Sequence, residues 1–115
     1  MIQVGTKLKN IDNSGAKLVT CIGCLSGYKQ RYAYFGDVIT VSVQKLRKRR
    51  RTLVKVKKGQ VLQALIIRTK KKLTKKSNLF FFENSVILLN KQKKLVGTRI
   101  FGSLPKILRF NKYLR

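Results

Sequence analysis

The chain has no histidine and only three acidic residues, Asp12, Asp37 and Glu83, which lie far apart in the sequence. General acid–base catalysis usually recruits histidine or paired carboxylates. Ser14, in the stretch DNSGA, has no base nearby in the sequence that could activate it. Glycine patterns typical of nucleotide-binding loops are also missing. We therefore expect that the protein is not an enzyme.

Cysteine is scarce, because Cys21 and Cys24 form a single C-x-x-C. A zinc site needs about four ligands, and the chain offers neither a second cysteine pair nor a histidine. A redox pair would open a helix, whereas the surrounding KLVTCIGCLS is typical of a β-strand. Positions three apart in a strand face opposite sides, so we expect the two thiols to diverge and one or both to pack as small hydrophobic groups. No metal and no cofactor is expected.

Long apolar runs are missing too, and a membrane-spanning helix needs about 18 apolar residues or more. We find no amphipathic helix or lipidation signal that would attach the protein to a membrane surface. The first residues, MIQVGTKLKNIDNSG, resemble neither a signal peptide nor an Arg-rich transit peptide. We expect no membrane partner, and a protein that works in the compartment where it is made.

The only proline is Pro105, and no linker or internal repeat divides the sequence, which predicts one domain over residues 1–115. Short β-branched and aromatic runs recur between turn residues, and VITVSV alternates as a half-buried strand does. The strands that we predict are Lys7–Ile11, Lys17–Leu25, Asp37–Val43, Leu53–Val56, Val61–Thr69, Leu79–Glu83 and Val86–Asn90. Strands at this spacing without intervening helices predict an all-β fold, a small closed barrel.

Two local features complete the expected fold. The segment FFFENSVILL predicts a tight hairpin at Asn84–Ser85. Near the end, Ser103 can cap a helix and Pro105 can occupy its first turn, so we expect a short C-terminal helix over about residues 103–115.

Positive charge dominates the chain, with 28 lysines and arginines and a net charge of +25. Residues 45–59, KLRKRRRTLVKVKKG, contain no acidic residue, and neither does the second cluster, RTKKKLTKK, at 68–76. A solvated surface mixes both signs, and a nuclear localisation signal would not explain basic residues from Lys7 to Arg115. Neutralisation by nucleic acid phosphate fits best. On the strand map both clusters leave a strand and return, so the first would form a basic β-ribbon with an arginine-rich tip.

Arginine offers a planar fork for phosphate and stacks on bases, so we predict nucleic-acid contacts first from arginines and then from lysines. The arginines are Arg47, Arg49, Arg50, Arg51, Arg68 and Arg99; the lysines are Lys48, Lys55, Lys57, Lys58, Lys70, Lys71, Lys72, Lys75 and Lys76. Tyr28, Tyr32 and Tyr34 could stack on bases, or pack in the core or at the barrel rim. RNA suits two long basic loops better than DNA does, since the only helix expected is short and terminal.

Several motifs occur in an order that resembles the universal large-subunit ribosomal protein 14 family. They are MIQ, DNSGA (12–16), CI (21–22), RYA with GD (31–37), VKKG and RTKK (56–71) and GTRIFG (97–102), and the resemblance covers about residues 1–110. It implies a five-stranded β-barrel with an attached ribbon and small C-terminal helices. It also implies direct binding of large-subunit rRNA, a neighbouring large-subunit protein as partner, a bridge to small-subunit rRNA and, in several lineages, a silencing factor.

By matching motif positions, the resemblance implies roles in RNA contact or loop shape for nine residues. They are Asn13, Arg31, Lys57, Lys58, Arg68, Lys70, Lys71, Arg99 and Arg109. Asp12, Ser14 and Gly15 are expected to hold a turn instead.

Two departures from the family bear on origin. The family normally continues past the terminal helix, whereas this sequence stops at Arg115, and its basic loop is richer in charge than usual. Frequent Lys, Phe, Ile and Asn suggest an AT-rich genome. We therefore expect a ribosomal protein of the mitochondrial matrix, with a bacterial or plastid member as the alternative. A free-standing nucleic-acid-binding module of basic barrel type, or an adaptor that binds anionic membranes or another partner, would be competing functions.

Overall fold

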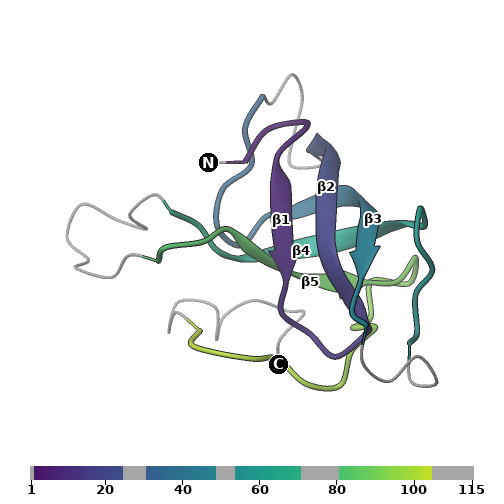
Figure 1. Cartoon of the computed structure of the whole chain (residues 1–115). Helices are drawn as coiled ribbons and strands as arrows, with labels where there is room; N and C mark the ends of the chain where they lie inside the picture. Colours follow the sequence, from purple (N-terminus) through teal and green to yellow (C-terminus); the bar gives the residue numbers. More distant parts are fainter. Residues whose placement is uncertain (1, 25–30, 49–53, 71–80, 105–115) are drawn as a thin grey trace.

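The computed structural model describes residues 2–24, 31–48, 54–70 and 81–104, which form five β-strands (Figure 1). The strands are β1 (Lys7–Asn10), β2 (Ala16–Cys24), β3 (Val38–Leu46), β4 (Val61–Arg68) and β5 (Ser85–Leu89). The described residues contain no helix. The expected C-terminal helix falls almost entirely on residues 105–115, which lie outside the described part of the chain, and Ser103 and Leu104 before it are not helical.

The five strands close into a barrel, as the sequence and its family resemblance predicted, and they follow one another in chain order. Neighbouring strands pair antiparallel from β1 to β5, and the barrel is closed by a short parallel pairing of β1 with β5, in which Lys9 lies opposite Ser85. Closure leaves no unpaired strand edge. Each strand therefore has one face inside the barrel and one outside it.

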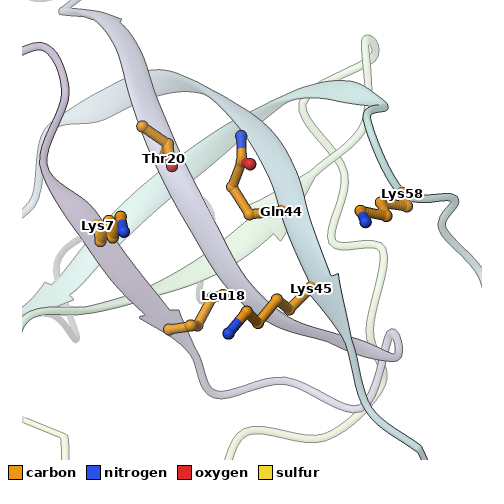
Figure 2. A pocket seen from close by; sticks show the side chains of 6 residues that line it. All are labelled: Lys7, Leu18, Thr20, Gln44, Lys45 and Lys58. Atoms are coloured by element: carbon orange, nitrogen blue, oxygen red, sulfur yellow. The ribbon is translucent and has the colours of Figure 1, made fainter.

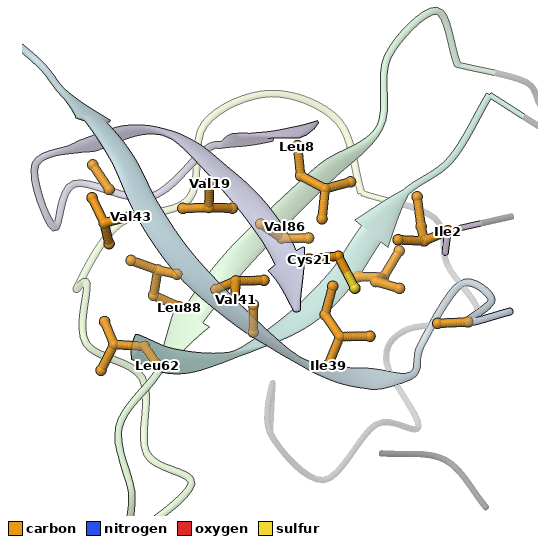
Figure 3. Packing of buried hydrophobic residues seen from close by; sticks show 14 of the residues in the cluster. Ile2, Leu8, Val19, Cys21, Ile39, Val41, Val43, Leu62, Val86 and Leu88 are labelled. Carbon is orange, nitrogen blue, oxygen red and sulfur yellow. The ribbon is translucent and has the colours of Figure 1, made fainter. Parts of the chain in front are cut away.

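The barrel interior is filled by aliphatic side chains at alternate strand positions (Figure 3). In β3, Ile39, Val41 and Val43 are buried, whereas Thr40 and Ser42 between them are only partly covered. This is the alternation that VITVSV predicted. Because β-branched side chains pack well on a pleated surface, they suit both the strand and its core.

A second apolar cluster covers the outer face of β4 and β5. Its buried members include Leu65 and Ile67 from β4 and Ile87 and Leu89 from β5, and Ile100 packs against them. All five residues of β5 are buried, as expected of a strand with apolar neighbours on both faces. One side of the barrel is thus covered by the chain itself.

Two predicted strands and the predicted hairpin are wrong. Residues 54–56 and 81–83, the described parts of the expected strands Leu53–Val56 and Leu79–Glu83, belong to no strand. Hydrophobic character alone favoured both, but neither segment finds a ladder partner. Ser85 opens β5 and pairs with Lys9 and Arg68, so Asn84–Ser85 leads into the barrel wall and does not turn a hairpin.

The basic stretch that joins β3 to β4 begins as a hairpin. Its arms stay paired as far as Val43, which exchanges backbone hydrogen bonds with Gly59 and Gln60. Beyond that point the arms bond to another part of the chain: the backbone N–H of Arg47 donates to Gly15 O at 2.8 Å and that of Lys55 donates to Ser14 O at 2.8 Å. Residues 49–53, the predicted arginine-rich tip, lie outside the described residues.

Candidate nucleic-acid interface

The turn DNSGA, between β1 and β2, is built around the buried carboxylate of Asp12. Its Oδ1 accepts hydrogen bonds from Asn10 Nδ2 at 2.6 Å, from the backbone N–H of Ser14 at 3.0 Å and from the Ser14 hydroxyl. Its Oδ2 accepts from the backbone N–H of Leu88 in β5 at 3.0 Å. Gly15 has φ 104°, a conformation that glycine adopts without strain. Asp12 therefore holds the turn and is buried in it.

Asn13 faces the other way and fastens the segment Gly97–Gly102, which we call the C-terminal strap. Its Oδ1 accepts from the backbone N–H groups of Thr98, at 2.7 Å, and Arg99, at 3.2 Å, and its Nδ2 donates to Thr98 Oγ1 at 2.8 Å. The motifs DNSGA and GTRIFG, far apart in sequence, thus pack against each other. The structure gives Asn13 a loop-shaping role.

Arg47, a predicted RNA contact, is half-buried and engaged by the protein. Its Nη2 donates to Asn10 O at 3.0 Å, and its guanidinium lies 5.4 Å from the centre of the Phe101 ring. A cation over an aromatic face is attracted by the ring quadrupole. Arg47 therefore ties the basic stretch to the strap.

Arg68 is engaged in the same way at the end of β4. Its side chain is only 12% exposed, its Nη2 donates to Phe101 O at 3.0 Å, and its Nη1 lies 3.6 Å from Glu83 Oε1. The other oxygen of Glu83 accepts from Lys9 Nζ at 3.1 Å. Burial raises the pKa of Glu83, but the hydrogen bond and charge of Lys9, followed by the charge of Arg68, outweigh it and hold that pKa below its ordinary value.

The other predicted contacts divide between exposed residues and residues that the structure does not describe. Arg31, Lys48, Lys55, Lys57, Lys58, Lys70 and Arg99 are exposed, and so are Tyr32 and Tyr34. Arg49, Arg50, Arg51, Lys71, Lys72, Lys75, Lys76, Arg109 and Tyr28 lie outside the described residues. Lys55 Nζ donates to Val96 O at 3.3 Å, so Lys55 is exposed but also holds the chain ahead of the strap.

Sequence reasoning named Lys48 and Lys58 as contacts but did not name three lysines close to them, Lys7 on β1, Lys17 on β2 and Lys45 on β3. Lys7, Lys17, Lys45, Lys48 and Lys58 are all exposed and line two adjoining grooves, and we call these five residues the lysine wall. Figure 2 shows Lys7, Lys45 and Lys58 around the first groove, with Leu18, Thr20 and Gln44. The alternation of Lys7 and Lys9 with the buried Leu8 and Asn10 could have revealed the outward face of β1.

The two cysteines are closer to each other than the sequence suggested. In the pairing of β2 with β3 the register shifts between Cys21 and Gly23, so one extra residue of β2 resets the alternation. Cys21 is buried in the core and Cys24 packs against the same core, and both are free thiols. Burial first, and then the neighbouring Cys24, raises the pKa of Cys21 to about 11. The expectation that the thiols diverge is wrong, because the bulge turns both inward.

The described residues offer neither a metal cluster nor a membrane-spanning helix. Within residues 2–24, 31–48, 54–70 and 81–104, no three His, Cys, Asp or Glu side chains gather as they would around a metal ion. The same residues include no helix of the length and apolarity needed to cross a bilayer.

The fold and its motifs agree with a known family. The closed five-stranded barrel is present, and DNSGA and GTRIFG form one structural unit in it. The model of the family described as Ribosomal protein L14p/L23e matches residues 1–115, and the chain therefore belongs to this family of large-subunit ribosomal proteins.

Proposed function

We propose that the protein binds large-subunit rRNA directly, through basic side chains that project from the barrel, and so stabilises the folded RNA of the large subunit. Family membership establishes a structural role in the ribosome. The single observation that carries the RNA contact is the charge: the whole chain has three acidic residues for 28 basic ones. Phosphate supplies the counter-charge that the chain lacks.

The three carboxylates have partners within the barrel. Asp12 is buried in its turn and Glu83 pairs with Lys9 and Arg68. Asp37 accepts a hydrogen bond from the backbone N–H of Tyr34 at 2.8 Å. Exposed residues such as Lys48, Lys57 and Arg99 are therefore the ones that we assign to RNA, while Asn13, Arg47 and Arg68 hold the loops in place.

The strap gives this assignment a mechanism. Asn13 and Arg68 hydrogen-bond the backbone between Thr98 and Phe101, and Arg47 lies against the Phe101 ring. The exposed Arg99 is therefore presented on a segment that the protein holds in place. Ordering before binding reduces the conformational entropy that the complex would otherwise lose. Phosphate contacts orient a protein on its RNA but do not read the base sequence. Recognition then depends on the shape of the RNA, which basic side chains can match only if the protein holds them at fixed positions.

We further propose that the protein lies on the face of the large subunit that meets the small subunit, where it contacts small-subunit rRNA and a neighbouring large-subunit protein. Val4 and Ile22, which are 62% and 45% exposed, support the protein contact. They lie on adjoining segments, since Gly5 N donates to Cys21 O. A silencing factor that blocks subunit joining would use the same face. These positions rest on the family resemblance.

The compartment that we propose is the mitochondrial matrix, on the basis of the high Lys, Phe, Ile and Asn content. A bacterial or plastid ribosome is the alternative. Ribosomal proteins typically are not enzymes, and we propose no catalytic activity.

Sedimentation of a native lysate tests the proposed function. We expect the protein to travel with the large subunit, to resist a moderate salt wash, and to be released by RNase. Migration at the top of the gradient, or release by a light salt wash, would contradict the proposal and favour a free nucleic-acid-binding module.

A further inference from the structure

We propose that the lysine wall is an RNA-binding surface on the side of the barrel, a docking site for a sugar–phosphate backbone that extends from the base of the basic stretch between β3 and β4 onto β1 and β2. This inference rests on the proposed function, and it names a surface through which part of the rRNA would be bound. The barrel is asymmetric: the apolar cluster around Leu65, Ile67 and Ile87 covers the outside of β4 and β5. The outside of β1, β2 and β3 instead carries exposed lysines.

The strand register places these lysines around a shallow floor. Lys7 lies opposite Thr20, which lies opposite Ser42, and the next rung joins Lys9, Leu18 and Lys45. Since strands are about 4.8 Å apart, β1 and β3 lie about 10 Å from each other across β2. Lys7 and Lys45 are therefore one rung apart on opposite sides of this strand. Long side chains at the rim and shorter ones between them make the surface concave. The two grooves measure about 290 and 490 Å³.

The charge of the wall has no counterpart among the described residues that line it. Within that part of the chain, neither groove has an acidic residue in its lining. Glu83 faces Lys9 and Arg68, which are outside the wall. Five positive charges on one face repel one another, and a bound polyanion removes that cost.

The chemistry of the wall selects phosphate over base edges and over a membrane. Lysine is a point charge on a flexible stem without the directional fork of arginine, so it suits backbone contacts independent of sequence. Membrane binding would need apolar side chains that insert below the headgroups. Among the described residues, the only apolar ones in the two linings are Leu18 and Leu46, and both are partly buried. RNA backbone is therefore the occupant that we infer.

Two triple variants of the full chain test the wall. In the wall variant, Lys7→Gln, Lys45→Gln and Lys58→Gln remove three charges from the grooves. In the control, Lys91→Gln, Lys93→Gln and Lys94→Gln remove the same charge from exposed positions after β5. The probe is an RNA hairpin with a stem of about 20 base pairs, titrated by fluorescence anisotropy between 50 and 200 mM salt. Circular dichroism checks that both variants fold.

We expect the wall variant to bind the hairpin about 10- to 100-fold more weakly at 100 mM salt, with a salt slope smaller by about two to three. The control should lose clearly less affinity and change the slope by less than one. Equal losses of affinity in both variants would overturn the proposal, because RNA binding would then depend only on the total charge of the chain and not on where the lysines lie. If the unaltered chain also fails to travel with the large subunit, the proposed function fails as well.

Two further measurements distinguish RNA docking on the wall from membrane binding and from a surface that stays bare in the ribosome. In intact large subunits, Lys7, Lys45 and Lys58 should react slowly with an acetylating reagent and become reactive after RNase treatment. Unchanged reactivity after RNase would overturn the proposal. Vesicles of phosphatidylglycerol and phosphatidylcholine serve as the membrane probe: wall-dependent binding to them that is tighter than binding to the hairpin would contradict RNA as the occupant.

Discussion

At the residue scale, the same side-chain type serves two different purposes in this protein. Arg47 and Arg68 donate to backbone carbonyls of Asn10 and Phe101, whereas Arg99 is exposed. Sequence reasoning treated all three as RNA contacts, because a basic run does not reveal which guanidinium finds a carbonyl in the folded chain. The family resemblance implied RNA contact or loop shape for Asn13, as it did for Arg68 and Arg99, and the hydrogen bonds of Asn13 describe the second role.

The buried carboxylate of Asp12 should be essential to stability. Asp12→Asn replaces one carboxylate oxygen by an NH₂ group, which cannot accept a hydrogen bond. Either the backbone N–H of Leu88 or the donors of Asn10 and Ser14 then lose their acceptor. An unsatisfied buried donor costs about 1–3 kcal/mol, and more where the lost acceptor was charged. We expect the free energy of unfolding to fall by about 2–3 kcal/mol in urea titrations. Asp37→Asn, at a more open turn, should cost less than about 1 kcal/mol; equal costs would contradict the role of Asp12.

The two thiols should differ in reactivity. The thiolate is the nucleophile, and with a pKa of about 11 only about one Cys21 thiol in a thousand is ionised at pH 8. Cys24 is only partly buried. We expect iodoacetamide to modify Cys24 first, and Cys21 only after denaturant is added, as mass spectrometry would show. In Cys24→Ser the native chain should stay unmodified at Cys21, and rapid labelling there would refute the burial.

At the element scale, patterns within one strand were predictable, but contacts between strands were not. VITVSV predicted the inside and outside of β3 because alternation is a local property. The bulge after Cys21 depends on how β2 fits β3. Residues 54–56 form no strand, and the backbone N–H of Lys55 bonds instead to Ser14 O, in a turn far away in the sequence. The sequence showed the strap only as the motif GTRIFG, and its packing against Asn13 became apparent only in the structure.

The close approach of the strap to the DNSGA turn should require glycine at position 97. A Cβ there would lie 2.8 Å from both Asn13 Oδ1 and Asp12 Cβ. We expect Gly97→Ala to destabilise the protein by about 1–3 kcal/mol, the usual cost of overpacking, as measured by urea unfolding. Gly23→Ala is the control, since a Cβ at Gly23 meets nothing within 4 Å and neither glycine has a positive φ. A cost for Gly23→Ala that equals the cost at Gly97 would contradict the close packing.

The ion pairs of Glu83 join β1 to the end of β4 and should make stability depend on pH. The folded-state pKa of Glu83 is lowered from 4.5, so its contribution is present above about that pH and is lost as the pH falls through the folded value. We expect thermal stability to drop between pH 5 and pH 3, by less in Glu83→Gln than in the unaltered protein. Because Glu83 is partly exposed, the effect should shrink in high salt. An identical pH profile for both proteins would rule out this coupling.

At the scale of the whole molecule, the net charge of the chain is +25, because three acidic residues cannot neutralise 28 basic ones. One side of the barrel is covered by apolar side chains and another carries exposed lysines. Its core is complete, with side chains such as Ile39, Leu65 and Leu88 fully buried. The apolar packing therefore favours the compact state, while the surface charge opposes it. In the ribosome, RNA phosphate would remove that opposition. In the free protein, only dissolved salt ions can reduce the repulsion between these charges.

The stability of the free protein should therefore increase with ionic strength. Exposed charges interact over about 30 Å in 0.01 M salt but only about 3 Å in 1 M salt, so screening reduces repulsion among the lysines. We expect the thermal midpoint to rise from 20 mM to 500 mM sodium chloride, and to rise less in the variant that lacks Lys7, Lys45 and Lys58. Sucrose at matched osmolarity adds no ions and separates screening from general exclusion effects. A midpoint that is constant or falls with salt would mean that repulsion does not limit the fold, and the bare lysine face would then need no polyanion to be stable.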